Sequence, residues 1–498
     1  MTWRLALRNL LFRPWRTVLL LAGYGLGVAV MVVLLAVGDA MIAQASDEKL
    51  VGGGTVTVLP EGLDVEVMKT GGIGGMFFSI ANARFVFHQL LASPRLARDV
   101  RAVAPQVEGK LAYVTLADGR EVAVRATGEL PSATAAVGAA PPLAAGAWRD
   151  DDGDRRWRAP TDVELRHDLD HFHLPPADAR RRESWAEWHY FNVLWPDASR
   201  WAFITFAVGG DVPRGEWGGQ LLVTLHERGK PARRFSRAVP RDSVRFSLHD
   251  ADLRLADARV TVDGAGRYRV TGRAPAERGA GAVTLDLLVA PAPRAWFPGA
   301  TLVAGESPSG YAVLGLRAQA SGTLCVDGTC TRLDGVQGYH DHNWGTWQGV
   351  TWDWGAARAG SYTLLYGRVR PPDDQRAGDA PLFAYLVDSL GYRAVFRPRR
   401  IAYDDTRTVA TAAGPLAVPG RARFVDVRGD DTLDVMLDID DATATDTRAG
   451  LVERGETGLA RRLATPWFLQ LQGRMTLRGR VGGQPIGGTG FGFFETYR

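Results

Sequence analysis

Two patterns of apolar residues divide the chain. Thr17–Val37 is a run of 21 residues without a charged side chain, which is long enough to span a bilayer as a helix. From about residue 161 the pattern changes to short runs of alternating, β-branched or aromatic residues that are separated by turn residues. In the stretch 433–439 every second residue is Leu, Val or Ile, which is typical of a half-buried strand. We therefore expect one membrane-length helix followed by a mainly β chain.

The repeated short runs predict antiparallel β-barrels or sandwiches over the second two-thirds of the chain. Roughly 330 residues are too many for one small barrel, so we expect two β domains that meet near residue 355. A short helix is possible at Thr447–Leu463. The expected strands are Trp201–Val208, Gln220–His226, Arg259–Val262, Arg267–Thr271, Val283–Val289, Tyr362–Val369, Leu382–Asp388, Thr432–Ile439, Phe468–Gln472 and Arg474–Val481.

The N-terminal third is less regular. Strand-like runs at Thr55–Leu59 and Leu111–Leu116 and a helical stretch at Arg84–Leu91 lie among Gly-rich segments. Residues 131–160 have the composition of a linker, first rich in Ala, Gly and Pro and then charged. The expected domains are residues 1–45 (cytoplasmic tip and anchor, with the helix at 17–37), 46–130 (a small α+β segment), 131–160 (linker), 161–355 and 356–498 (two β domains).

The charges around the apolar run predict its orientation. Because cationic residues stay on the cytoplasmic side, the N-terminus is expected in the cytoplasm and the bulk of the chain in the periplasm or another extracytoplasmic space. A cleaved signal peptide is the alternative, since Ala43-Gln44-Ala45 resembles a cleavage site, but the run is longer than the usual apolar region of such peptides. The flanking charges are Arg4, Arg8, Arg13 and Arg16 before the run and Asp39, Asp47 and Glu48 after it.

The two cysteines fit an exported chain. Cys325 and Cys330 flank Asp327-Gly328, a strong signal for a two-residue hairpin turn. In such a hairpin the cysteines lie opposite each other as a non-hydrogen-bonded pair, at a distance that a disulfide accepts. A reduced pair is the alternative. Export favours the disulfide, and the absence of a second Cys pair disfavours a zinc site.

Composition argues against nucleic-acid binding. The formal net charge is only +4 over 498 residues, and acidic residues are interspersed with the arginines throughout. A mixed, solvated surface of this kind lacks the basic face that nucleic-acid binding needs.

One octapeptide concentrates most of the candidate chemistry. Residues 338–345 read Gly-Tyr-His-Asp-His-Asn-Trp-Gly. Titratable groups among aromatic side chains suit the protonation or binding of a lipophilic unsaturated molecule, and addition of water to it would need a strong proton donor, stabilisation of a carbocation and a positioned water. Asp341 is the candidate acid, because burial among indoles keeps a carboxyl protonated. The faces of Tyr339, Trp344 or Trp347 are candidates for cation–π stabilisation, and His342 or His340 for orienting water.

The same residues have a structural interpretation. In a strand Tyr339, Asp341 and Asn343 share one face, while His340, His342 and Trp344 share the other. Only one set faces a given cavity, and the other set is then a hydrogen-bonded network that ties two barrels together.

Three further histidines invite a metal interpretation. On a strand His167, His171 and His173 would share a face, which makes a site of three imidazoles geometrically possible. Such a site also needs second-shell partners, so the expectation is no metal and no cofactor.

From about residue 161 the chain resembles the carotenoid 1,2-hydratase (hydroxyneurosporene synthase, CrtC) and AttH-like family of tandem lipocalin-like β-barrels. Three separated motifs carry the resemblance: 170–173 with 187–191, then 338–345, and finally 490–497. It implies catalysis by Tyr339 and Asp341. The stretch 310–315, where the hydratases have a His–Trp pair, contains neither residue, and His189 replaces a Trp of the first motif. The predicted ligand contacts are Trp344, Trp347, His340, Asn343, Trp188, His189, Tyr190, His171 and His173.

Residues 1–130 resemble the start of an ABC-transporter permease of the MacB/FtsX kind. The matching features are Leu7-Arg8-Asn9-Leu10, Glu48-Lys49-Leu50 and Val103-Ala104-Pro105. Such permeases need further membrane helices, which this sequence lacks, so the resemblance implies anchoring rather than transport.

Two classes of function remain open. The first is a membrane-anchored enzyme that binds a lipophilic, isoprenoid- or polyene-like molecule and hydrates a C=C bond. The second is a non-catalytic lipocalin-like binding protein associated with ABC transporter subunits. A role in which the fold merely shapes a polyene is a more remote third. The expected partners are a lipophilic small molecule and the inner membrane, and no nucleic acid.

Overall fold

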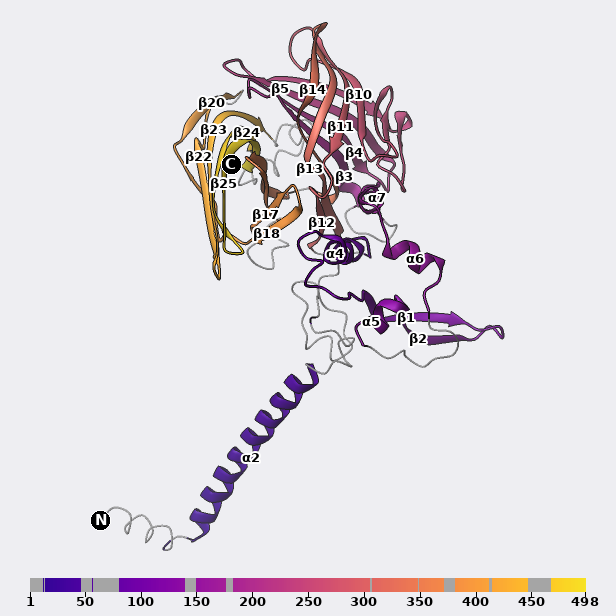
Figure 1. Cartoon of the computed structure of the whole chain (residues 1–498), viewed down its shortest axis with the longest axis vertical. Coiled ribbons are helices and arrows are strands. Elements are labelled where there is room, and N and C mark those ends of the chain that lie inside the picture. Colours follow the sequence, from indigo (N-terminus) through magenta and orange to yellow (C-terminus); the bar gives the residue numbers. More distant parts are fainter. Residues whose placement is uncertain are drawn as a thin grey trace, which may run out of the picture. The chain divides into compact units, whose positions relative to one another are not determined.

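The structure, a computed structural model, describes most of the chain (Figure 1). The strand expected at Thr55–Leu59, apart from Val56, and the helix expected at Thr447–Leu463 lie outside the described residues. The described residues are 12, 14–45, 56, 80–138, 149–175, 182–304, 307–347, 349–370, 381–411, 414–446 and 467–498.

The chain forms two compact units, and the first contains the apolar helix. This helix, α2 (Pro14–Ala45), is long and apolar enough to cross a membrane, and its apolar side chains are exposed. Residues 99–156 of the same unit contain the hairpin β1 (Gln106–Thr115) and β2 (Glu121–Glu129) and the short helix α5 (Pro131–Ala136). The predicted linker, residues 131–160, contains two short helices, α5 and α6 (Asp152–Arg158).

The second unit consists of residues 76–98 and 157–498 and contains both large sheets. Two helices precede its strands: α4 (Ile80–Ala92), at the position expected for a helix, and α7 (Asp162–His167). Helix α7 begins at a capping box in which Thr161 and Glu164 bond each other's backbone N–H groups. Arg84 of α4 forms an ion pair with Asp168, at 2.6 Å, which attaches α4 to the end of α7.

The first sheet is barrel-like and antiparallel, as predicted. Its strand order is β6-β5-β4-β3-β14-β13-β11-β10-β9-β8-β7, with β12 also paired to β13. A bridge between Phe235 of β6 and Ala276, next to β10, brings the two sides of the sheet together. The strands are β3 (Trp185–Leu194), β4 (Arg200–Asp211), β5 (Glu216–Glu227), β6 (Arg233–Pro240), β7 (Val244–Phe246), β8 (Leu253–Leu255), β9 (Ala258–Val262), β10 (Tyr268–Pro275), β11 (Ala282–Pro291), β12 (Phe297–Ala304), β13 (Ser307–Val326) and β14 (Thr329–Thr346), with 3-10 turns at Arg182–Ser184 and Arg241–Ser243.

The second sheet is a half-barrel with the order β18-β17-β16-β15-β25-β24-β23-β22-β19, beside a small β20–β21 hairpin (Figure 1). One correction concerns Phe468–Gln472 and Arg474–Val481, which were expected as two strands. They form one strand because Gly473 lets the backbone of Asp438 approach closely, so pairing continues past it. The strands are β15 (Thr351–Ala359), β16 (Tyr362–Arg370), β17 (Phe383–Asp388), β18 (Gly391–Phe396), β19 (Ala402–Asp404), β20 (Arg407–Thr411), β21 (Gly414–Val418), β22 (Arg421–Arg428), β23 (Asp431–Asp446), β24 (Trp467–Val481) and β25 (Gln484–Tyr497).

Three apolar cores hold the second unit together. One fills the first sheet and another lies on the second. The third contains residues of both sheets, among them Tyr190, Tyr339, Trp354 and Phe493. Because this shared core is also where polar motif residues are buried, it positions the candidate site.

The β13–β14 hairpin is formed as predicted. Asp327 and Gly328 have φ values of 53° and 82°, as the primed turns of two-residue hairpins require. Cys325 pairs with Cys330 across the strands, and the two are joined by a disulfide.

Removing this disulfide should have a small effect on stability. It closes a loop with a sequence separation of only 5, so it restricts the unfolded chain only slightly. This restriction raises the free energy of unfolding by about 2 kcal/mol. The Asp327-Gly328 turn also favours the hairpin independently of the disulfide. The double substitution Cys325→Ser/Cys330→Ser should therefore lower the free energy of unfolding by about 2 kcal/mol or less. Urea denaturation measures this, and loss of the folded state would contradict it.

Candidate functional site

Strand β14 carries the octapeptide through the middle of the first sheet. It pairs with β3 so that His342 lies opposite His189 and Asp341 opposite Tyr190. Directly opposed residues point to the same face of a sheet, and successive residues point to opposite faces. The octapeptide is thus divided between the shared core and the interior of the first sheet.

On the shared-core face lies a group that we call the carboxyl cluster: Tyr339, Asp341, Asn343, Tyr190 and Glu495. Asp341 accepts one hydrogen bond on each oxygen, from the Tyr339 hydroxyl and from the Asn343 amide, both at 2.7 Å. Trp354, from the second sheet, donates its indole N–H to the Tyr339 hydroxyl at 3.0 Å.

Glu495 is the second carboxyl of this cluster and comes from β25. The Tyr190 hydroxyl donates to one of its oxygens at 2.6 Å, and the Trp352 indole donates to the other at 3.0 Å. Burial raises the pKa of Glu495 to about 7, against the lowering effect of these two donors. Burial likewise raises the pKa of Asp341 to about 7, with the Glu495 charge adding to the shift and Tyr339 opposing it.

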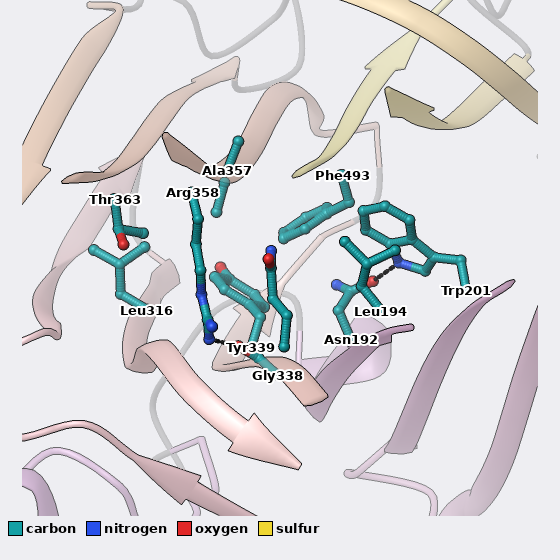
Figure 2. Close-up of a pocket in the computed structure, with 12 residues that line it drawn as sticks. Asn192, Leu194, Trp201, Leu316, Gly338, Tyr339, Ala357, Arg358, Thr363 and Phe493 are labelled. Atoms are coloured by element: carbon teal, nitrogen blue, oxygen red, sulfur yellow. Dashed lines mark hydrogen bonds between the residues drawn. The ribbon is translucent and has the colours of Figure 1, made fainter. Parts of the chain in front are cut away.

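A small cavity lies beside the cluster, at the Gln337 end. Its volume is about 10 Å³, close to the space that one water needs. Figure 2 shows Tyr339, Arg358 and Phe493 around it, with the Arg358 guanidinium donating to the Gly338 carbonyl at 3.3 Å. The lining is mixed: Asn192, Gln337 and Thr363 offer polar side chains, and Leu194, Trp201 and Leu316 offer apolar ones.

An aromatic patch lies at the opposite end of the cluster. Its members are half-buried and touch in series: Trp188 with Trp347, Trp347 with Trp352, and Trp352 with Phe468 and Tyr497. The patch reaches both carboxyls. Trp352 donates a hydrogen bond to Glu495. Trp188 lies opposite Asn343, which donates a hydrogen bond to Asp341. The two carboxyls thus have an aromatic surface at one end and a small cavity at the other.

On the other face of β14 lies a second polar group, the histidine cluster: Asp170, His173, Glu187, His189, His340 and His342. His342 lies between two carboxylates, 2.8 Å from Asp170 Oδ1 and 3.0 Å from Glu187 Oε1. His173 approaches Glu187 with its ring, at 3.0 Å, and with its backbone N–H, at 2.8 Å. The His173 ring also stacks on Trp344, with the ring centroids 3.9 Å apart.

The charges of the histidine cluster follow from these contacts. Burial alone would lower the pKa of His342, but Asp170 and Glu187 raise it to about 9, so this imidazole is a cation. Burial would raise the pKa of Asp170, but the imidazoles around it hold that pKa well below its usual value. The Tyr268 hydroxyl donates a further hydrogen bond to Asp170.

The predicted site residues are therefore not one site. Tyr339, Asp341, Asn343, Tyr190, Trp188 and Trp347 lie on the shared-core side. His340, His342, His189, His173 and Trp344 lie on the other side, with His171 stacked on His173. His342 thus does not share a face with Asp341, beside which it was expected to orient water. Five residues of the two clusters and their surroundings were not predicted as site residues: Glu495, Trp352, Trp354, Asp170 and Glu187. The three acidic residues lie within the motifs 170–173, 187–191 and 490–497.

The three histidines His167, His171 and His173, considered for a metal site, do not lie on a strand. His167 ends α7 and lies 2.7 Å from Asp250, while His171 and His173 follow in a segment without regular structure. Among the described residues, two groups bring potential metal-ligating atoms within 4.8 Å of one another, and neither includes His167 or His171.

No family model matches the chain, and no curated protein matches it by sequence. Among solved structures, an AttH-type protein of Nitrosomonas europaea has a TM-score of 0.42 and 18% identity, covering 66% of this chain and 98% of its own. Kievitone hydratase of Nectria haematococca has a TM-score of 0.40 and 13% identity, covering 66% of this chain and 96% of its own.

A third solved structure, CghA, has a TM-score of 0.38 and 15% identity, covering 63% of this chain and 88% of its own. Likenesses at these scores carry no weight for function. Neither sequence comparison supports the permease resemblance of residues 1–130.

The raised pKa of Glu495 predicts a pH-dependent effect of Glu495→Gln on stability. A carboxyl whose pKa rises from 4.5 to about 7 on folding stabilises the fold fully below pH 4.5, and this contribution is lost as the pH rises through 7. Gln stays neutral. Relative to the wild type, the variant should gain up to about 3 kcal/mol of unfolding free energy between pH 4.5 and pH 8. Thermal unfolding across this range measures the difference, and a constant difference would contradict the assignment.

Proposed function

We propose that the carboxyl cluster hydrates a C=C bond of a lipophilic, isoprenoid- or polyene-like molecule. The observation that carries this proposal is the buried pair of carboxyls, Asp341 and Glu495, between an aromatic surface and a water-sized cavity. Addition of water to an alkene needs an acid for one carbon and a base for the attacking water. Two carboxyls in one low-dielectric site supply both.

Asp341 is the proposed acid. Its side chain is buried, and desolvation favours the protonated form that a proton donor needs. Tyr339 and Asn343, two residues away on either side, each bond one of its oxygens and so fix the orientation of the carboxyl group. An acid in a fixed orientation does not have to order itself during the reaction.

The proposed ligand contacts are the aromatic patch residues Trp188, Trp347 and Trp352. Their half-buried rings offer apolar area for an acyl or isoprenoid chain. Their faces also attract a carbocation, by the same electrostatic interaction that binds ammonium groups to aromatic rings. His171, His173 and Trp344 of the predicted contacts lie outside this patch and have no part in the proposal.

The proposed reaction balances without a cofactor. Asp341 transfers its proton to one alkene carbon, and the π electrons form that C–H bond and leave a cation on the other carbon. Water adds to the cation, and its surplus proton passes to ionised Glu495. Proton exchange between the two carboxyls then restores the starting state. The net change is the addition of H and OH across one C=C bond.

We also propose that α2 anchors the protein in the inner membrane, with the N-terminus in the cytoplasm and the sheets in the periplasm. Its exposed apolar side chains support this proposal, and so does the disulfide, which is stable in oxidising compartments. Association with ABC transporter subunits stays a prediction.

Hydration should depend on Asp341. The full-length protein in detergent, incubated with acyclic polyenes in H₂¹⁸O, should give a product that carries one ¹⁸O hydroxyl. Asp341→Asn should lower the rate at least a hundredfold, the size of a typical acid–base contribution. Mass spectrometry of the extracted products measures both effects.

The matched control is Asp434→Asn, which removes a carboxylate from a half-exposed ion pair with Arg423 and should keep the full rate. If no labelled hydroxyl forms and the polyene is recovered unchanged with the wild-type protein, hydration is wrong. Co-purification of the unchanged polyene would then favour the non-catalytic binding protein.

Anchoring predicts that the chain stays in the membrane with α2 intact. After expression with a C-terminal tag, the protein should resist extraction by alkaline carbonate and require detergent. Its intact mass should include residues 1–45. A soluble periplasmic product that begins after Ala45 would show a cleaved signal peptide instead.

A further inference from the structure

Two histidines of the histidine cluster have one ring nitrogen fixed by a backbone carbonyl. His189 Nε2 lies 2.9 Å from the Ala251 carbonyl oxygen, and His340 Nδ1 lies 3.1 Å from the Tyr190 carbonyl oxygen. A carbonyl only accepts hydrogen bonds, so each of these nitrogens carries the ring proton. In the neutral imidazole the other nitrogen, His189 Nδ1 or His340 Nε2, then presents a lone pair.

Both of these nitrogens lie near one carboxylate. His189 Nδ1 lies 3.9 Å from Asp170 Oδ1, and His340 Nε2 lies 3.9 Å from Asp170 Oδ2. These distances are too long for hydrogen bonds, and among the described residues neither nitrogen has a hydrogen-bond partner. Both rings are fully buried, so water in bulk does not reach them. Buried acceptors without a donor cost free energy, and a cation bound between them would remove this cost.

We propose that Asp170, His189 and His340 bind a divalent first-row transition-metal ion such as Zn²⁺. Their ligating atoms lie within 4.8 Å of one another. In a tetrahedral Zn²⁺ site with bonds of about 2.0–2.2 Å the donor atoms are about 3.3–3.6 Å apart, so binding must draw the three ligating atoms closer together. Two imidazoles and one carboxylate are a ligand set that Zn²⁺ and Fe²⁺ both accept. This assignment replaces the sequence-based expectation of no metal.

The surroundings of the three residues are those of a metal site. The carbonyls of Ala251 and Tyr190 hold the two rings in the orientation and tautomer that a ligand needs. Asp170 is held in turn by His342, at 2.8 Å, and by the Tyr268 hydroxyl. Outer partners of this kind are a regular feature of histidine–metal sites. The bound ion would tie the segment before β3 to the two adjacent strands β3 and β14.

The neighbouring group of His173, Glu187 and His342 provides a contrast. Its ligating atoms are also close together, but Glu187 Oε1 lies 3.0 Å from a ring nitrogen of each histidine. Glu187 is therefore already hydrogen-bonded to His173 and ion-paired with His342, whereas the free ring nitrogens of His189 and His340 stand 3.9 Å from Asp170. We therefore assign the ion to the Asp170 group alone.

The test uses the full-length protein, stripped with a chelator and titrated with Zn²⁺. We expect one Zn²⁺ per chain by inductively coupled plasma mass spectrometry, and a higher melting temperature after loading, because an ion that binds only the folded state stabilises it. Co²⁺ in place of Zn²⁺ should give visible absorption bands. His189→Gln and His340→Gln should each weaken Zn²⁺ binding at least a hundredfold, since loss of an outer partner alone costs 10–100-fold.

His173→Gln is the matched control, because it removes a histidine of the neighbouring group and should leave Zn²⁺ affinity within a few-fold of the wild type. Circular dichroism confirms that each variant is folded. Loss of binding in His173→Gln with retention in His189→Gln would overturn the choice of ligands. A wild-type protein that binds no Zn²⁺ or Co²⁺, with a melting temperature that neither ion changes, would overturn the site. Neither result depends on whether the carboxyl cluster hydrates alkenes.

Discussion

The burial of β14 on both faces is the constraint on which the candidate sites depend. Most polar side chains of a sheet face water, but here residues 339–342 are all buried. The pleat sends Tyr339 and Asp341 to one side and His340 and His342 to the other. Each set therefore needs its own partners, and the pairing of β14 with β3 supplies the first of them, Tyr190 and His189. As a result, the two polar clusters lie on opposite faces of one sheet.

On the shared-core side, polar contacts fix one sheet against the other. Buried carboxyls lose their hydration, and leaving one without donors costs more than an ordinary hydrogen bond contributes. The donors to Glu495 come from both sheets, Tyr190 from the first and Trp352 from the second. Trp354 reaches back from the second sheet to Tyr339. Since each bond requires a particular distance, these contacts restrict the position of the sheets more than apolar packing does.

Local features were predictable from sequence because they depend on neighbouring residues. The turn at Asp327-Gly328 determines which residues pair, and so the Cys325–Cys330 disulfide. Alternation in β14 likewise divided the octapeptide correctly between two faces. The partners were not predictable, because Glu495 meets Tyr190 across 305 positions and Asp170 meets His342 across 172. No local pattern specifies such contacts, and a single sequence does not rank Glu495 or Asp170 above the many other acidic residues.

The two clusters differ in the groups that face their carboxylates, and so in whether those carboxylates stay ionised. Asp170 and Glu187 face imidazoles, one of them the cation His342, so they stay ionised and suit binding or structure. Asp341 and Glu495 accept hydrogen bonds from neutral donors, and burial together with the Glu495 charge makes ionisation of Asp341 less favourable. A carboxyl that holds its proton near neutral pH is able to donate it. The acid chemistry that we propose therefore uses the shared-core face of β14, and the cation binding that we propose uses the opposite face.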